Sequence, residues 1–309
     1  MYEDLLILLI VRSKSFPLLA FMALLTGGVA IGFAGIFMRL SDVNPLASAF
    51  WRMALAAPVL WIWAWSQRRQ DTVRGKSIRF SAALVWAGVF FAGDMAIWHW
   101  SLHFTTVSNA TLLSNFAPIF ITVWFWLAYR MRFQQTFLVG MVTALFGAIW
   151  LVGAGESNAH ANASTAADHQ LWGDGLGLFS AVFYAAYQLS IKEARNRYST
   201  ARLMAWSTTI TGLCLLPFAW LTSGSFFPIS LAGWWPLIAL ALIAQIGGQT
   251  VIAYASAHLS ASLSSLSLLI QPLTAAIAAW ILFNETMMPL QIAGGAMLLF
   301  GIYLAKRAN

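Results

Sequence analysis

Five polar side chains that could bind or react with a small molecule lie in one otherwise apolar stretch of the sequence. They are Asp94, His99, His103, Asn109 and Asn115. Carboxylate, imidazole and amide groups occur in catalytic centres, in metal sites and along the walls of solute cavities. The choice among these three depends on the elements that carry the side chains.

A metal site is the weakest of the three interpretations. His99 and His103 are four residues apart, which places both on one face of a helix, and such a pair can bind a metal ion. No third ligand lies nearby in the sequence, whereas a zinc site uses three or four protein ligands. Cys214 is the only cysteine, so neither a cysteine cluster nor an intramolecular disulfide can form. We therefore expect no metal and no cofactor.

The composition places these side chains in a membrane. Only 9% of the 309 residues are charged and 60% are hydrophobic, whereas a soluble domain carries roughly a quarter charged residues. A chain with so few charges cannot face water on all sides. Its net charge of +7 does not indicate a nucleic-acid partner, because a basic binding patch needs a solvated surface. The lipid bilayer is the expected partner.

Ten runs of residues are apolar enough to cross a bilayer, which takes about 20 residues in a helix. The alternation of period two that is typical of a membrane barrel is absent from the sequence. We therefore predict an all-α integral membrane protein, in which short loops make neighbouring helices antiparallel. The expected spans are 17–39, 45–66, 80–103, 107–128, 134–152, 174–192, 202–222, 232–255, 262–283 and 288–305.

The positions of lysine and arginine predict the orientation of these spans. If the N-terminus is cytoplasmic, all 17 basic residues except Arg39 and Arg52 fall in cytoplasmic segments. This asymmetry is the positive-inside pattern. We expect a multi-pass protein of the cell (inner or plasma) membrane with both termini in the cytoplasm. Residues 1–16 then form a cytoplasmic stub, for which an overlong start-site assignment is an equal explanation, and residues 306–309 form a short tail.

The sequence repeats itself at an offset of 154 positions. Pro118 falls on Pro272 and Gly140 on Gly294, and matched tryptophans and leucines accompany them. Paired prolines and glycines at one offset are not expected from apolar composition alone. The chain therefore consists of two copies of one unit.

Each copy contains five spans, an odd number. The first covers residues 17–152, the second covers 174–305, and a polar outer loop at 153–173 links them. The second copy must enter the membrane from the opposite side. Such inverted repeats are typical of secondary transporters. A structural duplication without transport is the alternative.

The chain resembles the EamA-type drug/metabolite transporter superfamily from about Pro17 to Lys306. The resemblance is carried by the two five-helix copies and by PLASAFWRMALAAP, AIWHWSLHFTTVSNATLLSNFAPIF and ILFNETMMPLQIAGGAMLLFGIYL. The Trp98–His99 pair followed by VSNATLL is similar to the YddG-like branch of amino-acid and metabolite exporters. The resemblance implies transport, with amino acids as the first candidates. Its motifs are mainly structural and do not identify the solute.

Arg52 and Asp94 are charged residues that lie well inside the predicted spans, where a charge is costly and needs an explanation. Counted from the outer ends of their helices, both lie roughly 11 Å deep at 1.5 Å per residue. A buried carboxylate needs a partner, a proton or water. We expect an ion pair or a shared hydrated pocket. A structural bridge between the second and third spans is an equal alternative.

Other polar groups extend the predicted cavity wall. His99 lies deeper than His103 and can contact solute or accept a proton, although helix packing explains it as well. Asn115 and Gln271 bring amides close to Pro118 and Pro272, where a missing backbone donor exposes carbonyl groups. The full set of cavity candidates is Asp94, Trp98, His99, Asn109, Asn115, Tyr187, Gln249 and Gln271.

These features predict a secondary transporter that moves a small amphipathic metabolite, an amino acid or a related compound, in the direction of export by alternating access. Coupling to protons through Asp94 or His99 and facilitated diffusion fit equally well. Import by the same fold and a structural subunit are alternatives. A membrane-embedded enzyme is a further one, but the sequence contains no nucleophile–base or metalloprotease motif, so we expect no enzyme. The oligomeric state is not predicted.

Overall fold

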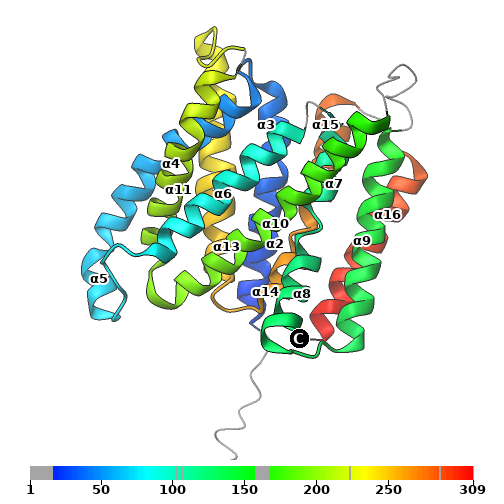
Figure 1. Ribbon diagram of the computed structural model, residues 1–309, viewed down its shortest axis with the longest axis horizontal. Helices are drawn as coiled ribbons and strands as arrows, with labels where there is room; N and C mark the ends of the chain where they lie inside the picture. The colour runs from blue at the N-terminus through cyan, green and yellow to red at the C-terminus, as the bar shows by residue number, and fades with distance from the viewer. Residues whose placement is uncertain are drawn as a thin grey trace, which may run out of the picture.

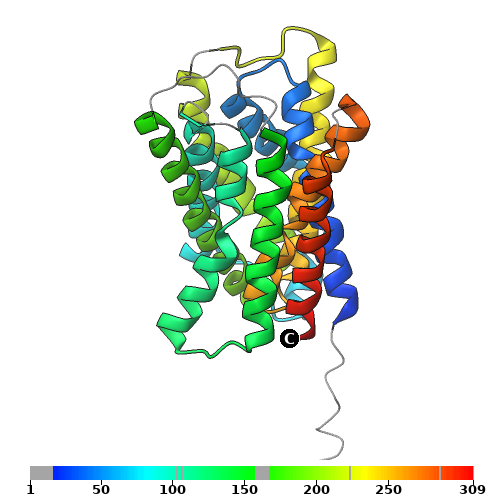
Figure 2. The ribbon, with the colours of Figure 1, turned by 90° about the vertical axis from the view of Figure 1, so that its right-hand side faces the viewer.

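Helices are the regular elements of the computed structural model, which describes residues 17–101, 104–105, 107–156, 167–222, 224–284 and 287–308. Within these ranges no strand occurs, and the helices stand side by side as one bundle (Figures 1 and 2). The prediction of an all-helical chain is confirmed for this part. The predicted stub at 1–16, most of the loop between the halves and His103 lie outside the described residues.

The first half follows the predicted spans closely. The first span is divided between α2 and α3, the fourth between α7 and α8, and a short helix, α5, follows the second. The elements are α2 (Leu18–Gly32), α3 (Ala34–Leu40), α4 (Pro45–Ser66), α5 (Arg68–Val73), α6 (Ala82–Ser101), α7 (Val107–Ser114), α8 (Ala117–Tyr129) and α9 (Gln135–Glu156).

The second half contains one long helix and two interrupted spans. The eighth span combines several kinds of helix, and the ninth is divided like the fourth. The elements are α10 (Ala167–Arg197), α11 (Thr200–Leu221), the 3-10 turn η1 (Leu231–Gly233), α12 (Trp234–Ala239), the π-helix η2 (Leu240–Gln249), α13 (Thr250–Ala255), α14 (Ala261–Ser267), α15 (Ile270–Phe283) and α16 (Pro289–Arg307).

Nine segments of the described residues are long and apolar enough to cross a membrane. The predicted sixth span lies in α10, which has 31 residues but is not among the nine. Apolar side chains cover the outside of the bundle: Trp65, Leu127 and Leu221 are 72%, 65% and 82% exposed. An apolar surface of this extent needs a hydrocarbon environment. The protein is therefore a multi-pass membrane protein.

The ends of several helices recur at the offset of the sequence repeat. Arg130 and Asn284, 154 positions apart, end α8 and α15 in the left-handed conformation with φ of 51° and 53°. The next helices, α9 and α16, begin at Gln135 and Pro289, again 154 positions apart. The duplication seen in the sequence is therefore also seen in the structure, in the positions of these turns between helices.

Glycines hold α9 and α16 against each other. A Cβ atom added at Gly140 would lie 2.7 Å from the carbonyl oxygen of Gly301, and one added at Gly147 would lie 2.6 Å from that of Gly294. Only glycine permits backbones to approach this closely. Because the earlier residue of α9 meets the later residue of α16, the two helices run antiparallel, side by side in Figure 2. The last helices of the two halves therefore form one tight pair.

The buried apolar residues form clusters that mix the two halves. One cluster includes Leu24 of α2 and Leu298 of α16, and another includes Met53 of α4 and Leu203 of α11. Tyr184 in the middle of α10 packs against both clusters and against a third, smaller one. The centre of the molecule therefore lies at the middle of α10.

Candidate functional site

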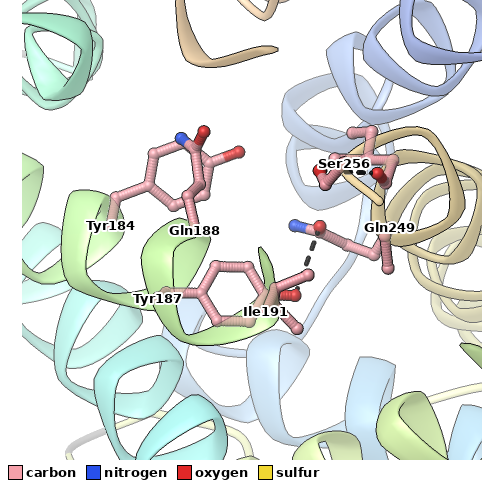
Figure 3. A pocket seen from close by; sticks show the side chains of 8 residues that line it. Tyr184, Tyr187, Gln188, Ile191, Gln249 and Ser256 are labelled. Carbon is pink, nitrogen blue, oxygen red and sulfur yellow. Dashed lines mark hydrogen bonds between the residues drawn. The ribbon is translucent and has the colours of Figure 1, made fainter. Parts of the chain in front are cut away.

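Two stripes of side chains face each other across the centre of the bundle (Figure 3). In each stripe the residues follow the spacing i, i+3, i+4 and i+7, which places them on one face of a helix. They enclose a cavity of about 10 Å³, room for roughly one water molecule. The stripe on α10 is Tyr184, Tyr187, Gln188 and Ile191, and the stripe that begins on η2 and ends just after α13 is Gln249, Ile252, Ala253 and Ser256.

Three of the residues predicted from the sequence come together here from three helices. The hydroxyl of Tyr187 on α10 donates to Oε1 of Gln249 on η2 at 3.4 Å, a bond that is dashed in Figure 3. The hydroxyl of Tyr184 lies beside the amides of Gln249 and of Gln271, which belongs to α15. The amide nitrogen of Gln271 is buried and has no hydrogen-bond partner within the described ranges.

The π-helix η2 presents two buried amides to the centre. Gln245 is fully buried and Gln249 is 3% exposed. A π-helix of ten residues is unusual, since most are single turns, and they occur frequently at functional sites. η2 also packs tightly on α2, because a Cβ atom at Gly27 would lie 2.9 Å from the carbonyl oxygen of Gly248. Close packing against α2 therefore holds η2 in place.

Arg52 on α4 is almost completely buried, at 5% exposed. Its Nε donates to Oε1 of Gln245 at 3.0 Å, and Nε2 of Gln245 donates to the hydroxyl of Thr208 on α11 at 2.9 Å. The guanidinium carbon lies 5.8 Å from the centre of the Phe91 ring, within the range of a cation–π interaction. A charged network thus joins α4, η2 and α11.

Asp94 on α6 is bound to a different helix from the one that binds Arg52. Its Oδ1 accepts a hydrogen bond from the hydroxyl of Ser180 on α10 at 2.6 Å. Arg52 and Asp94 form no direct ion pair, although each lies within electrostatic range of the other and of the hydroxyls of Tyr184 and Tyr187. The sequence led us to expect either an ion pair between Arg52 and Asp94 or a pocket that both side chains share. The contacts of the described residues fit the shared pocket better than the ion pair.

Trp98 and His99 lie farther along α6. Their ring centres are 4.8 Å apart, and the rings are nearly perpendicular. Nδ1 of His99 is 2.5 Å from the carbonyl oxygen of Met95 in the preceding turn. Nε2 of His99 is buried without a partner in the described part of the chain, and the ring lies within electrostatic range of Arg52. His99 therefore borders the polar centre, with one nitrogen engaged by its own helix.

The amides of the fourth span lie near the break between α7 and α8. Asn115, at the break, donates through Nδ2 to the carbonyl oxygen of Thr111 at 2.7 Å, so its contact is with its own helix. Asn109 belongs to α7, but its side chain lies outside the described part of the structure. Pro118 and Pro272 are buried in the first turns of α8 and α15, where proline's missing donor costs no intrahelical bond.

A second, wider cavity of about 330 Å³ lies toward the end of the bundle where α8 and the C-terminus lie (Figure 1). Lys192 lines this wider cavity, and its ammonium group donates to the carbonyl oxygens of Ser256, which borders the central cavity, and of Leu259. The wider one is lined by Trp124, Phe125, Tyr129, Leu189, Lys192, Glu193, Asn196 and Ala257.

Sequence reasoning missed several members of this site. Tyr184, Gln188 and Ile191 share one helix face with the predicted Tyr187 and could have been found from that spacing alone. Gln245 could have been found as the second buried amide of the eighth span. Ser180 carries no signal in the sequence, because serine in a membrane helix most often serves packing. No cluster of three or more possible metal ligands occurs among the described residues.

A bundle of membrane-crossing helices around a buried polar centre fits a membrane transporter. The family comparison agrees: the model of the EamA-like transporter family matches residues 18–153 and 171–307. The chain belongs to this family, and the resemblance noted in the sequence is confirmed.

Several relatives are named transporters or exporters. The chain is 25% identical to an uncharacterized transporter of Archaeoglobus fulgidus, over 95% of this chain and 97% of that one. It is 22% identical to the pseudopaline exporter CntI of Pseudomonas aeruginosa (72% and 74% covered). It is 28% identical to a probable terminal-alkyne amino-acid exporter of Streptantibioticus cattleyicolor (68% and 67% covered). A crystal structure with a TM-score of 0.75 and 16% identity covers 93% of this chain and 97% of that one, which shows the same fold.

Proposed function

We propose that this transporter exports a small amphipathic metabolite, an amino acid or a related compound, across the cell membrane by alternating access. The observation that carries the proposal is the pair of facing stripes on α10 and η2–α13, with the charges of Arg52 and Asp94 beside them. Polar and charged groups are costly inside a membrane and are retained there for function. The names of two relatives support export and an amino-acid-like solute.

The proposal includes ten spans in two inverted halves, at residues 17–152 and 174–305. Helix α10 supplies the tenth span, since its 31 residues extend roughly 46 Å at 1.5 Å per residue. Two observations support the inversion: the helix ends that recur after 154 positions, and the antiparallel contact between the equivalent helices α9 and α16. With both termini in the cytoplasm, the wider cavity opens on the cytoplasmic side.

The small central cavity means that helices must move before a solute can occupy the centre. A central space of about 10 Å³ is far below the roughly 300 Å³ at which ligand pockets begin, whereas the wider cavity of about 330 Å³ reaches it. A solute from the cytoplasm would first occupy the wider cavity. It would reach the centre when α10 separates from α13, which breaks the bonds of Lys192 to Ser256 and Leu259. Opposite movement on the far side would then release it.

The transport function is tested by comparing metabolites in cells with and without the protein, in both cells and medium. For an exporter we expect the concentration of one amphipathic solute to be lower inside the cells and higher in the medium when the protein is present, because net outward flux moves the solute from the cells to the medium. Accumulation in the cells instead would establish import. An unchanged set of metabolites in both compartments would contradict transport. Repeating the measurement with an uncoupler separates proton coupling, which loses uphill flux, from facilitated diffusion.

Filling the wider cavity should slow transport without unfolding the protein. We expect Ala257→Trp to lower the export rate about tenfold or more, because the indole would occupy part of a space of solute size. Ala232→Trp is a matched control, since Ala232 is exposed in η1, away from both cavities. Initial efflux rates from preloaded proteoliposomes measure the effect. Equal rates for the two variants would exclude the wider cavity from the solute's path.

A further inference from the structure

The segment between α4 and α6 binds the turn between α10 and α11 at the end of the bundle that carries α5 and the C-terminus (Figure 1). The backbone nitrogen of Ser77 donates to the carbonyl oxygen of Arg197 at 2.8 Å. The ammonium group of Lys76 donates to the carbonyl oxygens of Arg195 and Asn196 at 3.1 Å and 3.2 Å. We call the two joined segments, residues 68–81 and 195–202, the basic junction.

Positive charge dominates the basic junction. Asp71 is its one acidic residue, and eight of its residues are basic. The side chain of Asp71 is 2% exposed, and its Oδ2 accepts a hydrogen bond from the hydroxyl of Ser199 at 2.8 Å. One carboxylate cannot neutralise so many cations. The basic residues are Arg68, Arg69, Arg74, Lys76, Arg79, Arg195, Arg197 and Arg202.

Two arginines of the basic junction have guanidinium nitrogens that lack a partner. Arg202 is 7% exposed, and its Nη1 donates to the carbonyl oxygen of Ile78 at 3.4 Å. Nε of Arg202 and Nε of Arg195 are buried and have no hydrogen-bond partner in the part of the chain that the structure describes. Buried donors are nearly always satisfied in native proteins, and a buried cation normally has an anionic partner. The two arginines therefore suit an anion with several acceptor oxygens.

Aromatic side chains place this anion at the membrane surface. Trp206 follows Arg202 by about one turn of α11, and its ring centre lies 4.7 Å from that of Phe80 and 4.9 Å from that of Trp61. Aromatic rings gather where a membrane meets water. Phe80 and Val73 are 55% and 87% exposed and lie in the same segment as the basic residues. Exposed apolar side chains among basic ones are typical of a segment that lies on a membrane surface.

We propose that the basic junction binds the phosphate group of an anionic phospholipid. Arg202 and Arg195 donate to the phosphate oxygens, for which a planar guanidinium is well suited, and the rings of Phe80 and Trp206 contact the start of the acyl chains. Basic pockets at the cytoplasmic ends of membrane helices are suited to such head groups. The site lies apart from both cavities, and the inference does not depend on the transport function. Inorganic phosphate has the same chemistry, so the experiment must distinguish the two sources.

The inference is tested by measuring the apparent Tm of the purified full-length protein in detergent with added phosphatidylglycerol, phosphatidylcholine or inorganic phosphate. We expect phosphatidylglycerol to raise the apparent Tm by roughly 3–5 °C, the shift for a ligand present at about ten times its dissociation constant. Phosphatidylcholine should have a much smaller effect, because its choline group cancels the charge of its phosphate. Equal apparent Tm values in the two lipids, with no effect of inorganic phosphate, would overturn the inference. A rise of the same size with inorganic phosphate alone would keep the anion site and overturn the lipid as its ligand.

Variants identify the residues through the difference in apparent Tm between the two lipids, which does not depend on the stability of each variant without lipid. Arg202→Gln should lose most of this difference, and so should Arg195→Gln, whose side chain is only half-buried. Arg132→Gln is the matched control, because Arg132 is exposed between α8 and α9 at the same end of the bundle and lies outside the basic junction.

Two outcomes would show that the assignment to these arginines is wrong. In the first, folded Arg202→Gln and Arg195→Gln variants keep the full difference between the lipids. In the second, Arg132→Gln loses as much of the difference as they do, which would mean that anionic lipid is attracted to the positive surface in general. If neither arginine variant folds, the comparison of the two lipids and phosphate on the unchanged protein and on Arg132→Gln decides the inference.

Discussion

The Gly147→Leu variant is expected to lose most of its folded fraction. A Cβ atom at Gly147 would lie 2.4 Å from the backbone nitrogen of Leu298 and 2.6 Å from the carbonyl oxygen of Gly294. Both atoms belong to the backbone of α16, so no side chain can rotate away, and α9 and α16 must separate. Overpacking usually costs about 1–3 kcal/mol when side chains can adjust, and a backbone clash along a whole helix pair should exceed it. Size-exclusion elution and the apparent Tm in detergent measure the loss.

Gly153 offers a control in the same helix. A Cβ atom there meets nothing within 4 Å, so Gly153→Leu should change stability by no more than about 0.5 kcal/mol. Gly301→Leu, at the equivalent position of the second half, should reproduce the defect of Gly147→Leu, because its Cβ atom would lie 2.4 Å from the backbone nitrogen of Ala144. Equal apparent Tm values for Gly147→Leu and Gly153→Leu would contradict the close packing of α9 on α16.

Local signals explain why much of the fold was predictable from the sequence. The expected span 45–66 coincides with α4, and the expected start at 134 lies one residue before α9. At the start of α4, Asn44 accepts from the backbone nitrogen of Ala47 at 2.7 Å and Pro45 occupies the first helical position, both ordinary N-terminal signals. An apolar run with such a start gives nearly the same helix in any membrane protein.

Deviations from regular helices were not predictable, because they depend on packing between distant segments. The π-helix η2 contacts α2, and its Gly248 meets Gly27 more than 200 positions earlier in the chain. The breaks after α7 and after α14 precede prolines, but the sequence does not indicate that each break separates two short helices. Helix α10 continues beyond its predicted span at both ends. The polar residues in these extensions lower the mean hydropathy of the helix, so a hydropathy criterion does not detect its full length.

The site was predictable as a set of residue types and not as a set of contacts. Tyr187, Gln249 and Gln271 were expected in a cavity wall, and the structure places them around one cavity or beside a residue that lines it. The partners of the charged residues were not foreseen, since Gln245 is 193 positions from Arg52 and Ser180 is 86 positions from Asp94. Depth along a helix can be counted from the sequence, whereas the rotation of one helix against another cannot.

The Gln245→Leu variant is expected to destabilise the protein through Arg52. It removes the acceptor from the buried guanidinium at 3.0 Å and the donor from Thr208 at 2.9 Å. Losing a buried hydrogen bond to a charged group costs about 1.5–3 kcal/mol, so the apparent Tm in detergent should fall by roughly 3–12 °C. Gln135→Leu, exposed at the start of α9, is the matched control and should leave the apparent Tm nearly unchanged.

The double variant Arg52→Leu with Gln245→Leu separates the structural role of Arg52 from its role in transport. Replacing both partners by apolar side chains of similar size can be nearly neutral, because no buried charge remains without a partner. We therefore expect the double variant to regain most of the stability lost in Gln245→Leu, with a coupling energy of about 0.5–3 kcal/mol. If Arg52 binds the solute, this restored protein still fails to transport amino acids in proteoliposomes. Recovery of transport together with stability would show that the arginine serves only to join α4 to η2.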